Sequence, residues 1–402
     1  MKRREFLKGL VFSTVFTLPG ICLLPGRLAA AIPPPSVSGA LRDRVLVLVE
    51  LKGGNDGLNT VIPHRDPLYY RHRPSLAVPE PEVIALDGKL GLHPGMKALM
   101  PVWNSGDLAV ALGTGYPDPN RSHFRSIDIW NTASGSDHFL DIGWVSRVFR
   151  DVSRTGNVPQ DLVADGLVLG TDSPGPLAGD GMRTLILRNP RQFIKQADRV
   201  SVYDSPVKNA SLDHILAVLR DVRDSARILK EKFRRPASFK TAFPKSNFGR
   251  SMEMTAKLIS SGVAIPVIKI SHGSFDTHSR QQNQHQRLLT ELANSMGAFS
   301  GAMRETGQWD RVLLMTYSEF GRRVAENGSG GTDHGTAAPH FLLGGRVKGG
   351  FYGSQPSLED LDDGDLRYQL DYRSLYRTVA EDWWGVAFQA EESFPKVPFL
   401  KG

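Results

Sequence analysis

The chain has 402 residues, 40% of them hydrophobic and 23% charged, and its 49 Lys and Arg against 42 Asp and Glu give a formal net charge of +7. This length and composition suffice to bury a large core, as one large α/β domain or as two smaller ones. The only cysteine, Cys22, lies in a predicted signal segment. The mature protein would then have no thiol, which excludes cysteine catalysis and thiolate metal sites.

The N-terminal segment has the pattern of a twin-arginine signal peptide. Arg3 and Arg4 precede an apolar run over residues 9–24, and the three alanines at 29–31 offer small residues for cleavage. Because this run is short and broken by Pro19, we expect residues 1–31 to be removed after export through the twin-arginine translocase. A retained membrane anchor is the alternative, but we expect no stable membrane span after processing.

Removal of this segment also removes most of the excess charge. Residues 1–31 hold five basic residues and one acid, which leaves 44 Lys and Arg against 41 Asp and Glu, a net of +3. A balance this close to neutral gives no case for nucleic-acid binding. We therefore predict a periplasmic or secreted protein that binds no nucleic acid.

Four apolar stretches predict buried strands of a mainly parallel sheet: residues 44–51, 107–113, 263–270 and the run from 311 to 318. Helices are predicted over residues 93–104, 213–234, 281–304 and 372–388. The alternation of strands and helices at both ends of the chain indicates the α/β class. The region 130–250 is less regular, with short strands expected at 166–170 and 183–188, and could be an insertion or a cap.

Polar side chains follow each of the four predicted strands. They are Asp56 after the first strand, Ser122 and His123 after the second, His272, Asp276 and His278 after the third, and Glu319, Asp333, His334 and His340 after the fourth. In open α/β sheets ligands bind at the carboxyl ends of the strands, so we expect these loops to converge. Carboxylates with neutral imidazoles suit one or two Zn²⁺, Mn²⁺ or Mg²⁺ ions.

Such a site predicts a chemistry. Two ions about 4 Å apart would clamp the attacking and leaving oxygens of a phosphoryl or sulfuryl transfer. A serine beside them, such as Ser122, could be the nucleophile, because a bound cation lowers its pKa and removes the need for a histidine base.

Several of these side chains also have a structural interpretation. Asp56 could be a turn carboxylate that bonds to its own loop, and Ser122 could be the N-cap of a helix expected over 124–130. His340 precedes an apolar strand and could be a histidine satisfied within the core.

The remaining candidates are more specific. Asp276 and His278 are two residues apart, so in an extended segment both side chains face the same way, although a polar turn is the alternative. Asp333 and His334 lie side by side in a glycine-rich loop, where adjacent polar side chains have little packing purpose.

Five motifs occur in an order that resembles one bacterial family. They are Gly-Gly-Asn-Asp-Gly-Leu-Asn, Pro-Asn-Arg-Ser-His-Phe-Arg-Ser-Ile-Asp-Ile-Trp, Phe-Asp-Thr-His, Ser-Glu-Phe-Gly-Arg and Thr-Asp-His-Gly-Thr. The chain resembles the twin-arginine-exported family DUF1501, which is itself similar to the alkaline phosphatase and sulfatase superfamily. The resemblance implies a single alkaline-phosphatase-like domain over residues 32–402, a three-layer α/β/α sandwich with a mainly parallel sheet.

The resemblance also implies roles for individual residues. Asp56 would be the first-strand metal ligand, with Glu50 as the open alternative, and Ser122 would be the nucleophile. Asp333 and His334 match a late Asp-His pair that holds the ions. A second ion would be completed by Asp276, His278 and His340.

We therefore expect an exported, metal-dependent hydrolase of a phosphate or sulfate ester, either a small molecule or a polymer. Arg121 or Arg125 would neutralise the ester oxygens, His123 is a candidate acid or base, and Glu319 would bind or orient a ligand. The alternatives are a non-catalytic binding protein with a degenerate metal site on the same fold, and an assembly or structural factor.

Overall fold

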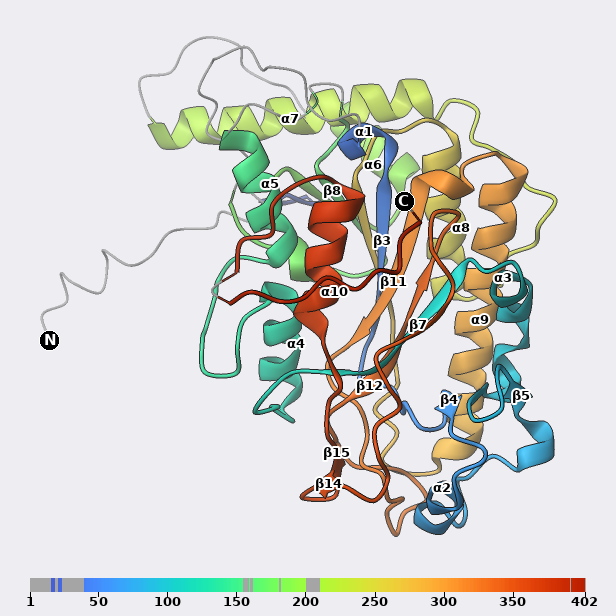
Figure 1. Ribbon diagram of the computed structural model, residues 1–402. Helices are drawn as coiled ribbons and strands as arrows, with labels where there is room; N and C mark the ends of the chain where they lie inside the picture. The colour runs from blue at the N-terminus through green and yellow to red at the C-terminus, as the bar shows by residue number, and fades with distance from the viewer. Residues whose placement is uncertain are drawn as a thin grey trace, which may run out of the picture.

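The chain forms one large β-sheet with helices on both faces (Figure 1). The computed structural model describes residues 16–18, 21–23, 40–154, 159, 162–180, 182–199, 210–390 and 392–401. The strand order is β1 (Phe16–Leu18), β2 (Ile21–Leu23), β9 (Thr184–Leu187), β8 (Gly166–Leu169), β10 (Val267–His272), β3 (Val45–Leu51), β11 (Val312–Ser318), β12 (Ala338–Leu343), β7 (Leu108–Gly115) and β13 (Gly350–Tyr352). In addition, β16 (Leu370–Asp371) pairs with β7.

The central part of the sheet is parallel. β9, β8, β10, β3 and β11 are parallel neighbours, whereas β12 runs antiparallel to both β11 and β7. β7 therefore points the same way as β11, and the strands that precede the predicted site loops all end at one edge of the sheet. In Figure 1 this is the lower edge, next to α2 (Pro67–His72), β14 (Leu361–Asp362) and β15 (Asp365–Leu366).

Strand β3 shows why the sheet is covered on both sides. Every residue of β3 is buried, and its side chains alternate between two hydrophobic cores. Val47 and Val49 pack into one core and Leu46 and Leu48 into the other. A strand with apolar side chains on both faces, as β3 has at every position except Glu50, needs cover on both sides, which the two helical layers supply.

The two helical layers come from different parts of the chain. The first core contains residues of η3 (Pro94–Leu99), α3 (Met100–Asn104), α6 (Pro190–Ala197), α7 (Ala210–Lys232), α8 (Asn247–Ser260) and α9 (Gln281–Glu305). The second contains residues of α1 (Ala40–Asp43), α4 (His123–Thr132), α5 (Trp144–Arg154), α10 (Tyr372–Thr378) and the π-helical turn η6 (Val379–Trp383). The predicted three-layer α/β sandwich with a mainly parallel sheet is confirmed.

Short elements complete the fold. β4 (Val61–Ile62), β6 (Gly91–Leu92) and β5 (Ile84–Ala85) form a small antiparallel sheet, and η2 (Glu80–Glu82), η4 (Gly175–Leu177) and η5 (Trp309–Arg311) are single 3₁₀ turns. The helix expected over 93–104 is divided into η3 and α3, with Pro101 near the start of α3, where a residue without an N–H is tolerated. The region 130–250 supplies β8 and β9 to the central sheet.

Most of the predicted signal segment, including Arg3, Arg4 and the alanines at 29–31, lies outside the described residues, so the signal stays a prediction. Two short pieces of it are described, as β1 and β2, and β2 pairs with β9. Within the described part of the chain, no helix is both long enough and apolar enough to cross a membrane.

Candidate metal centre

The loops at the carboxyl edge of the sheet bring histidines and acids together. His123 is the first residue of α4, Asp276 and His278 lie in the loop after β10, and His334 lies in the loop between β11 and β12. Asp276 is at the centre: its Oδ1 is 3.0 Å from His278 Nε2 and 3.2 Å from His334 Nε2. Its Oδ2 is 3.5 Å from His123 Nε2.

The three imidazoles share one orientation. The Nδ1 atom of His123 contacts Glu319, that of His278 lies 3.2 Å from Asp333 Oδ1, and that of His334 lies 2.8 Å from the Arg121 carbonyl. Each of these partners only accepts, so a neutral ring that carries its proton on Nδ1 presents the lone pair of its Nε2 toward Asp276. Metal-binding histidines are held in this way by an acceptor behind the ring.

The Nε2 atoms of the three histidines lie close together. Those of His278 and His334 are 2.9 Å apart, and ligand atoms of His123, Asp276 and His334 lie within 4.8 Å of one another. Two Nε2 lone pairs and a carboxylate repel each other unless a proton or a metal ion lies between them. Imidazole nitrogens with a carboxylate oxygen form a donor set that suits Zn²⁺ or another divalent transition metal. These residues therefore fit a divalent metal ion.

Charges around the cluster favour the forms that bind metal. Burial alone would raise the pKa of Asp276, but hydrogen bonds from Arg322 and His334 hold it below its usual value. Burial lowers the pKa of His334, although its bond to the Arg121 carbonyl opposes this, so the ring is neutral near neutral pH. Hydrogen bonds from Asn327 and then His278 lower the pKa of Asp333.

Arg322 was not assigned a role from the sequence, although it ends the Ser-Glu-Phe-Gly-Arg motif. Its buried guanidinium lies 2.8 Å from Asp276 Oδ1. It also donates to the carbonyls of Gly54 at 2.8 Å, Thr332 at 2.8 Å and Phe275 at 3.0 Å. One side chain thus connects the loops that follow β3, β10 and β11.

The conformation of Gly53, the first of the two glycines after β3, shows why glycine is needed there. Its φ is +105°, and a Cβ atom there would lie 2.4 Å from the backbone nitrogen of Asp276. Its own N–H donates to Glu319 Oε1 at 2.9 Å. Only glycine lets the loop after β3 approach the Asp276 loop this closely.

Asp56 lies outside this cluster, which corrects its assignment as a ligand. It is fully buried, and its Oδ2 accepts hydrogen bonds from Arg73 and Gln281. The alternative first-strand acid, Glu50, is bonded to Lys269 at 2.6 Å in the interior of the sheet. Asp56 Oδ2 and Glu50 Oε2 are thus occupied by protein donors, and Asp56 Oδ1 is buried without a hydrogen-bond partner among the described residues, away from the cluster around Asp276.

His340 is also outside the cluster, which corrects its assignment to a second ion. It lies on β12 with its ring 5.0 Å from that of Trp130, and it is 1% exposed. Burial lowers its pKa to about 3, and neither ring nitrogen has a hydrogen-bond partner among the described residues. The alternative interpretation, a histidine satisfied within the core, is right about the burial, but the ring is not satisfied by any hydrogen bond from the described residues.

The structure places the other candidates around the cluster. Asp333 holds His278 from behind and has no direct contact with Asp276 among the described contacts. The Arg125 guanidinium pairs with Asp128, donates to carbonyls of the loop after α4 and lies over the Phe139 ring. Its predicted role at the ester is therefore corrected, because it fastens this loop.

Ser122 is the N-cap residue of α4, as the structural interpretation proposed, but its side chain makes no capping hydrogen bond in the described structure. It is exposed, and both of its neighbours belong to the centre. Arg121 accepts from His334 through its carbonyl, and His123 faces Asp276. Ser122 therefore lies in the chain between two residues of the centre, and its hydroxyl does not cap the helix.

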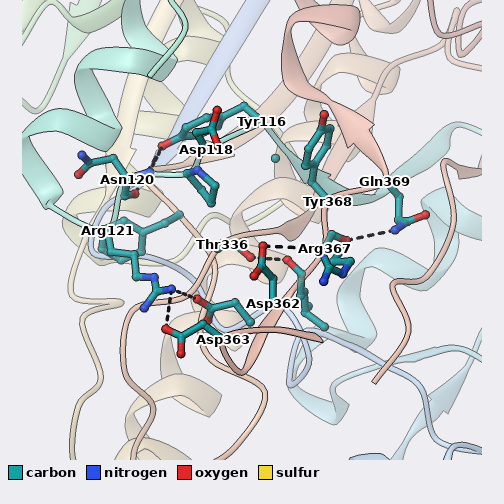
Figure 2. Close-up of a pocket in the computed structure, with 15 residues that line it drawn as sticks. Tyr116, Asp118, Asn120, Arg121, Thr336, Asp362, Asp363, Arg367, Tyr368 and Gln369 are labelled. Carbon is teal, nitrogen blue, oxygen red and sulfur yellow. Dashed lines mark hydrogen bonds and ion pairs between the residues drawn. The ribbon is translucent and has the colours of Figure 1, made fainter. Parts of the chain in front are cut away.

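A pocket of about 720 Å³ lies next to the cluster (Figure 2). Phe320 belongs to both, because it lines the pocket and its ring is 4.3 Å from that of His334. Figure 2 shows Arg121 and Asp363 at one side of the pocket, and Arg367, Tyr368 and Gln369 at the other. The Arg121 guanidinium is 2.6 Å from Asp365, which fixes it at the pocket wall.

One family model matches more than half of the chain. The model of the family described as "Protein of unknown function (DUF1501)" matches residues 114–380. No curated protein matches the chain.

Several solved structures are similar to the chain at low identity. A protein in the alkaline phosphatase superfamily from Vibrio parahaemolyticus has 9% identity and a TM-score of 0.40, covering 86% of this chain and 68% of its own. The C-terminal periplasmic domain of EcEptC from Escherichia coli, in complex with Zn, has 10% identity and a TM-score of 0.38, covering 90% and 88%. The PsFucS1 sulfatase from Pseudoalteromonas sp. has 10% identity and a TM-score of 0.37, covering 86% and 68%. Because these TM-scores lie below 0.5, the description of the site rests on the contacts above.

Proposed function

We propose, on the premise that this chain belongs to the DUF1501 family, that it is a metal-dependent hydrolase of a phosphate or sulfate ester. One observation carries the proposal: the Nε2 atoms of His123, His278 and His334 all face Asp276, and each Nδ1 is held by an acceptor. A divalent ion bound by these four residues would polarise the ester and stabilise the charge that develops on its oxygens.

Ser122 is the nucleophile in this proposal. Its exposed hydroxyl lies at the N-terminus of a ten-residue helix, where backbone N–H groups and the helix dipole favour an anionic ester. The serine oxygen bonds to phosphorus or sulfur as the bond to the alcohol breaks; the serine proton passes to water, and the alcohol takes up a proton. Water then releases phosphate or sulfate and restores the serine.

The pocket beside the cluster would hold the organic part of the ester. Arg121 lines the pocket and directly precedes Ser122 in the chain, and in this proposal its guanidinium, which pairs with Asp365, contacts the ester oxygens from the pocket side. The predicted signal segment adds that the protein is exported by the twin-arginine translocase and acts in the periplasm or outside the cell.

The test measures metal content by elemental analysis in protein purified without chelators. We expect about one to two equivalents of a transition metal in the wild type, lost in Asp276→Ala and in His334→Ala. His138→Ala, an exposed histidine outside the cluster, is the control and should keep the metal. Hydrolysis of phosphate and sulfate esters is then compared in the same four proteins, together with Ser122→Ala.

Two results would overturn the proposal. A wild-type protein that takes up no metal, even after Zn²⁺ or Mn²⁺ is added, has no metal centre. A protein that binds metal but hydrolyses neither class of ester is better described as a non-catalytic binding protein on the same fold.

A further inference from the structure

Gln281 connects the two loops that carry most of the metal centre. It is the first residue of α9 and is fully buried. Its Oε1 accepts hydrogen bonds from Thr277 Oγ1 at 3.0 Å and from Thr332 Oγ1 at 2.6 Å. Thr277 lies between Asp276 and His278, and Thr332 directly precedes the Asp333-His334 pair. A single amide oxygen therefore holds both ligand loops.

A buried ion pair fixes the other end of this amide. Gln281 Nε2 donates to Asp56 Oδ2, which also accepts from Arg73. The Asp56 and Arg73 side chains are both fully buried, and Arg73 donates to the carbonyls of Arg323 and Val324 at 2.9 Å. A carboxylate on one side and two hydroxyl donors on the other allow only one orientation of the amide.

We propose that Gln281 is a positioning residue for the metal centre. Anchored by Asp56 and Arg73, it sets the spacing of the loop after β10 and the loop before β12, so that His278 and His334 both face Asp276. The inference rests on the proposed function. It also gives Asp56, which the sequence suggested as a ligand, a different role, because this carboxylate supports the ligands from beneath.

The physical reason is the repulsion within the centre. In the form that binds a metal ion, both Nε2 atoms carry lone pairs, and these two atoms 2.9 Å apart repel each other and the Asp276 carboxylate, so the two loops must be held from behind. Groups that orient metal ligands from outside the coordination sphere change metal affinity by about 10–100-fold when they are removed. The Gln281 amide acts on both loops at once, so its removal should have an effect of this size.

The experiment compares Gln281→Met, which keeps the side-chain length and removes the amide, with Gln282→Met, its exposed neighbour on α9. Zn²⁺ affinity is measured by competition with a chelator. We expect Gln281→Met to bind Zn²⁺ about 10–100-fold more weakly and Gln282→Met to bind like the wild type. The absorption spectrum of the Co²⁺-loaded protein should change only in Gln281→Met, because it reports ligand geometry.

Thr332→Val is a second, milder variant in case Gln281→Met does not fold. It removes one of the two hydroxyl donors to Gln281 and keeps the shape of the side chain. Hydrogen exchange should accelerate in both ligand loops in Gln281→Met, but only in the 331–335 loop in Thr332→Val. If the wild type binds Zn²⁺ and Gln281→Met binds it equally well, the inference is overturned and the proposed function stands. If the wild type binds no Zn²⁺, the proposed function is overturned, and the inference with it.

Discussion

Asp276 and Asp56 each face a buried guanidinium, from Arg322 and from Arg73, yet the two carboxylates serve different purposes. The Asp276 side chain is 44% exposed and has imidazoles around it, whereas Asp56 is fully buried and bonded to protein donors. A partly exposed carboxylate that faces both solvent and imidazole nitrogens can bind a metal ion. One whose partners are all within the protein contributes to the fold instead.

The largest expected effect separates the two carboxylates by stability. Asp56→Ala should lower the free energy of unfolding by about 3–5 kcal/mol, because it leaves the Arg73 charge without its counter-ion in a site that water cannot reach. Urea unfolding followed by circular dichroism measures this. Asp363→Ala is the control, since this exposed acid pairs with arginines at the surface and should cost less than about 1 kcal/mol. A small loss in Asp56→Ala would contradict a supporting role for this carboxylate.

The reverse pattern is expected at Asp276. Asp276→Ala should lower Zn²⁺ affinity by more than the roughly 10–100-fold typical of residues that only orient a ligand. Its stability without metal should fall by less than in Asp56→Ala, because the buried Arg322 loses its carboxylate partner but water can reach the exposed Asp276 position and Arg322 keeps its carbonyl partners. Isothermal titration with Zn²⁺ and urea unfolding on the same samples give both numbers. Unchanged Zn²⁺ binding would remove Asp276 from the centre.

Lowering the pH should reduce the free energy of unfolding through three buried histidines. Burial lowers the pKa of His285 and of His340 to about 3, and that of His93 to about 4. Below about pH 6.5, the usual histidine pKa, the unfolded chain therefore binds protons that the folded chain excludes. Each of these histidines should reduce stability by about 1.4 kcal/mol per pH unit as the pH falls from about 6.5 toward the folded-state pKa.

His340→Phe sharpens this prediction, because the side chain makes no hydrogen bond within the described residues. The slope of unfolding free energy against pH should decrease by about 1.4 kcal/mol per unit between about pH 6 and about pH 4. Urea unfolding at several pH values measures the slope. An unchanged slope would mean that His340 is protonated in the folded protein.

The smallest effect concerns the residue behind His123. Glu319 accepts from Gly53 N–H with one oxygen and contacts His123 Nδ1 with the other. Glu319→Gln has only one oxygen and cannot accept from both, so we expect Zn²⁺ affinity to fall by about tenfold. The exposed Glu359→Gln is the control. Equal Zn²⁺ affinity in Glu319→Gln and the wild type would show that His123 needs no orientation from this side.

The parts predicted well from the sequence depend on local pattern. β3, β7, β10 and β11 are predominantly apolar runs, and the rule that ligands bind at carboxyl ends of strands located Asp276, His278 and His334 at one edge of the sheet. The antiparallel insertion of β12 between β11 and β7 could not be predicted, because no local pattern fixes which strands become neighbours.

The errors at the site have a common cause. In the sequence, Asp56 resembles an ordinary loop carboxylate. In the structure it is buried by Arg73 and Gln281, which lie 17 and 225 residues away in the chain. His340 looks like the partner of His334 until β12 turns its side chain toward Trp130. Burial and contacts between distant segments decide the role of these residues, and the neighbouring sequence predicts neither. The Ser-Glu-Phe-Gly-Arg motif could have identified Arg322 as a residue that connects loops, because an arginine next to glycine-rich loops has backbone carbonyls within reach.

The acceptors behind the three imidazoles have a consequence for how the protein acquires its ion. Each ring is already oriented through Nδ1 before any metal arrives, so binding would not need to order the ligands. Uptake would then be governed by release of water from the incoming ion and not by rearrangement of the chain. If the proposed ion binds here, folding and metal loading would be separate events, and the ion could be supplied in whichever compartment offers it.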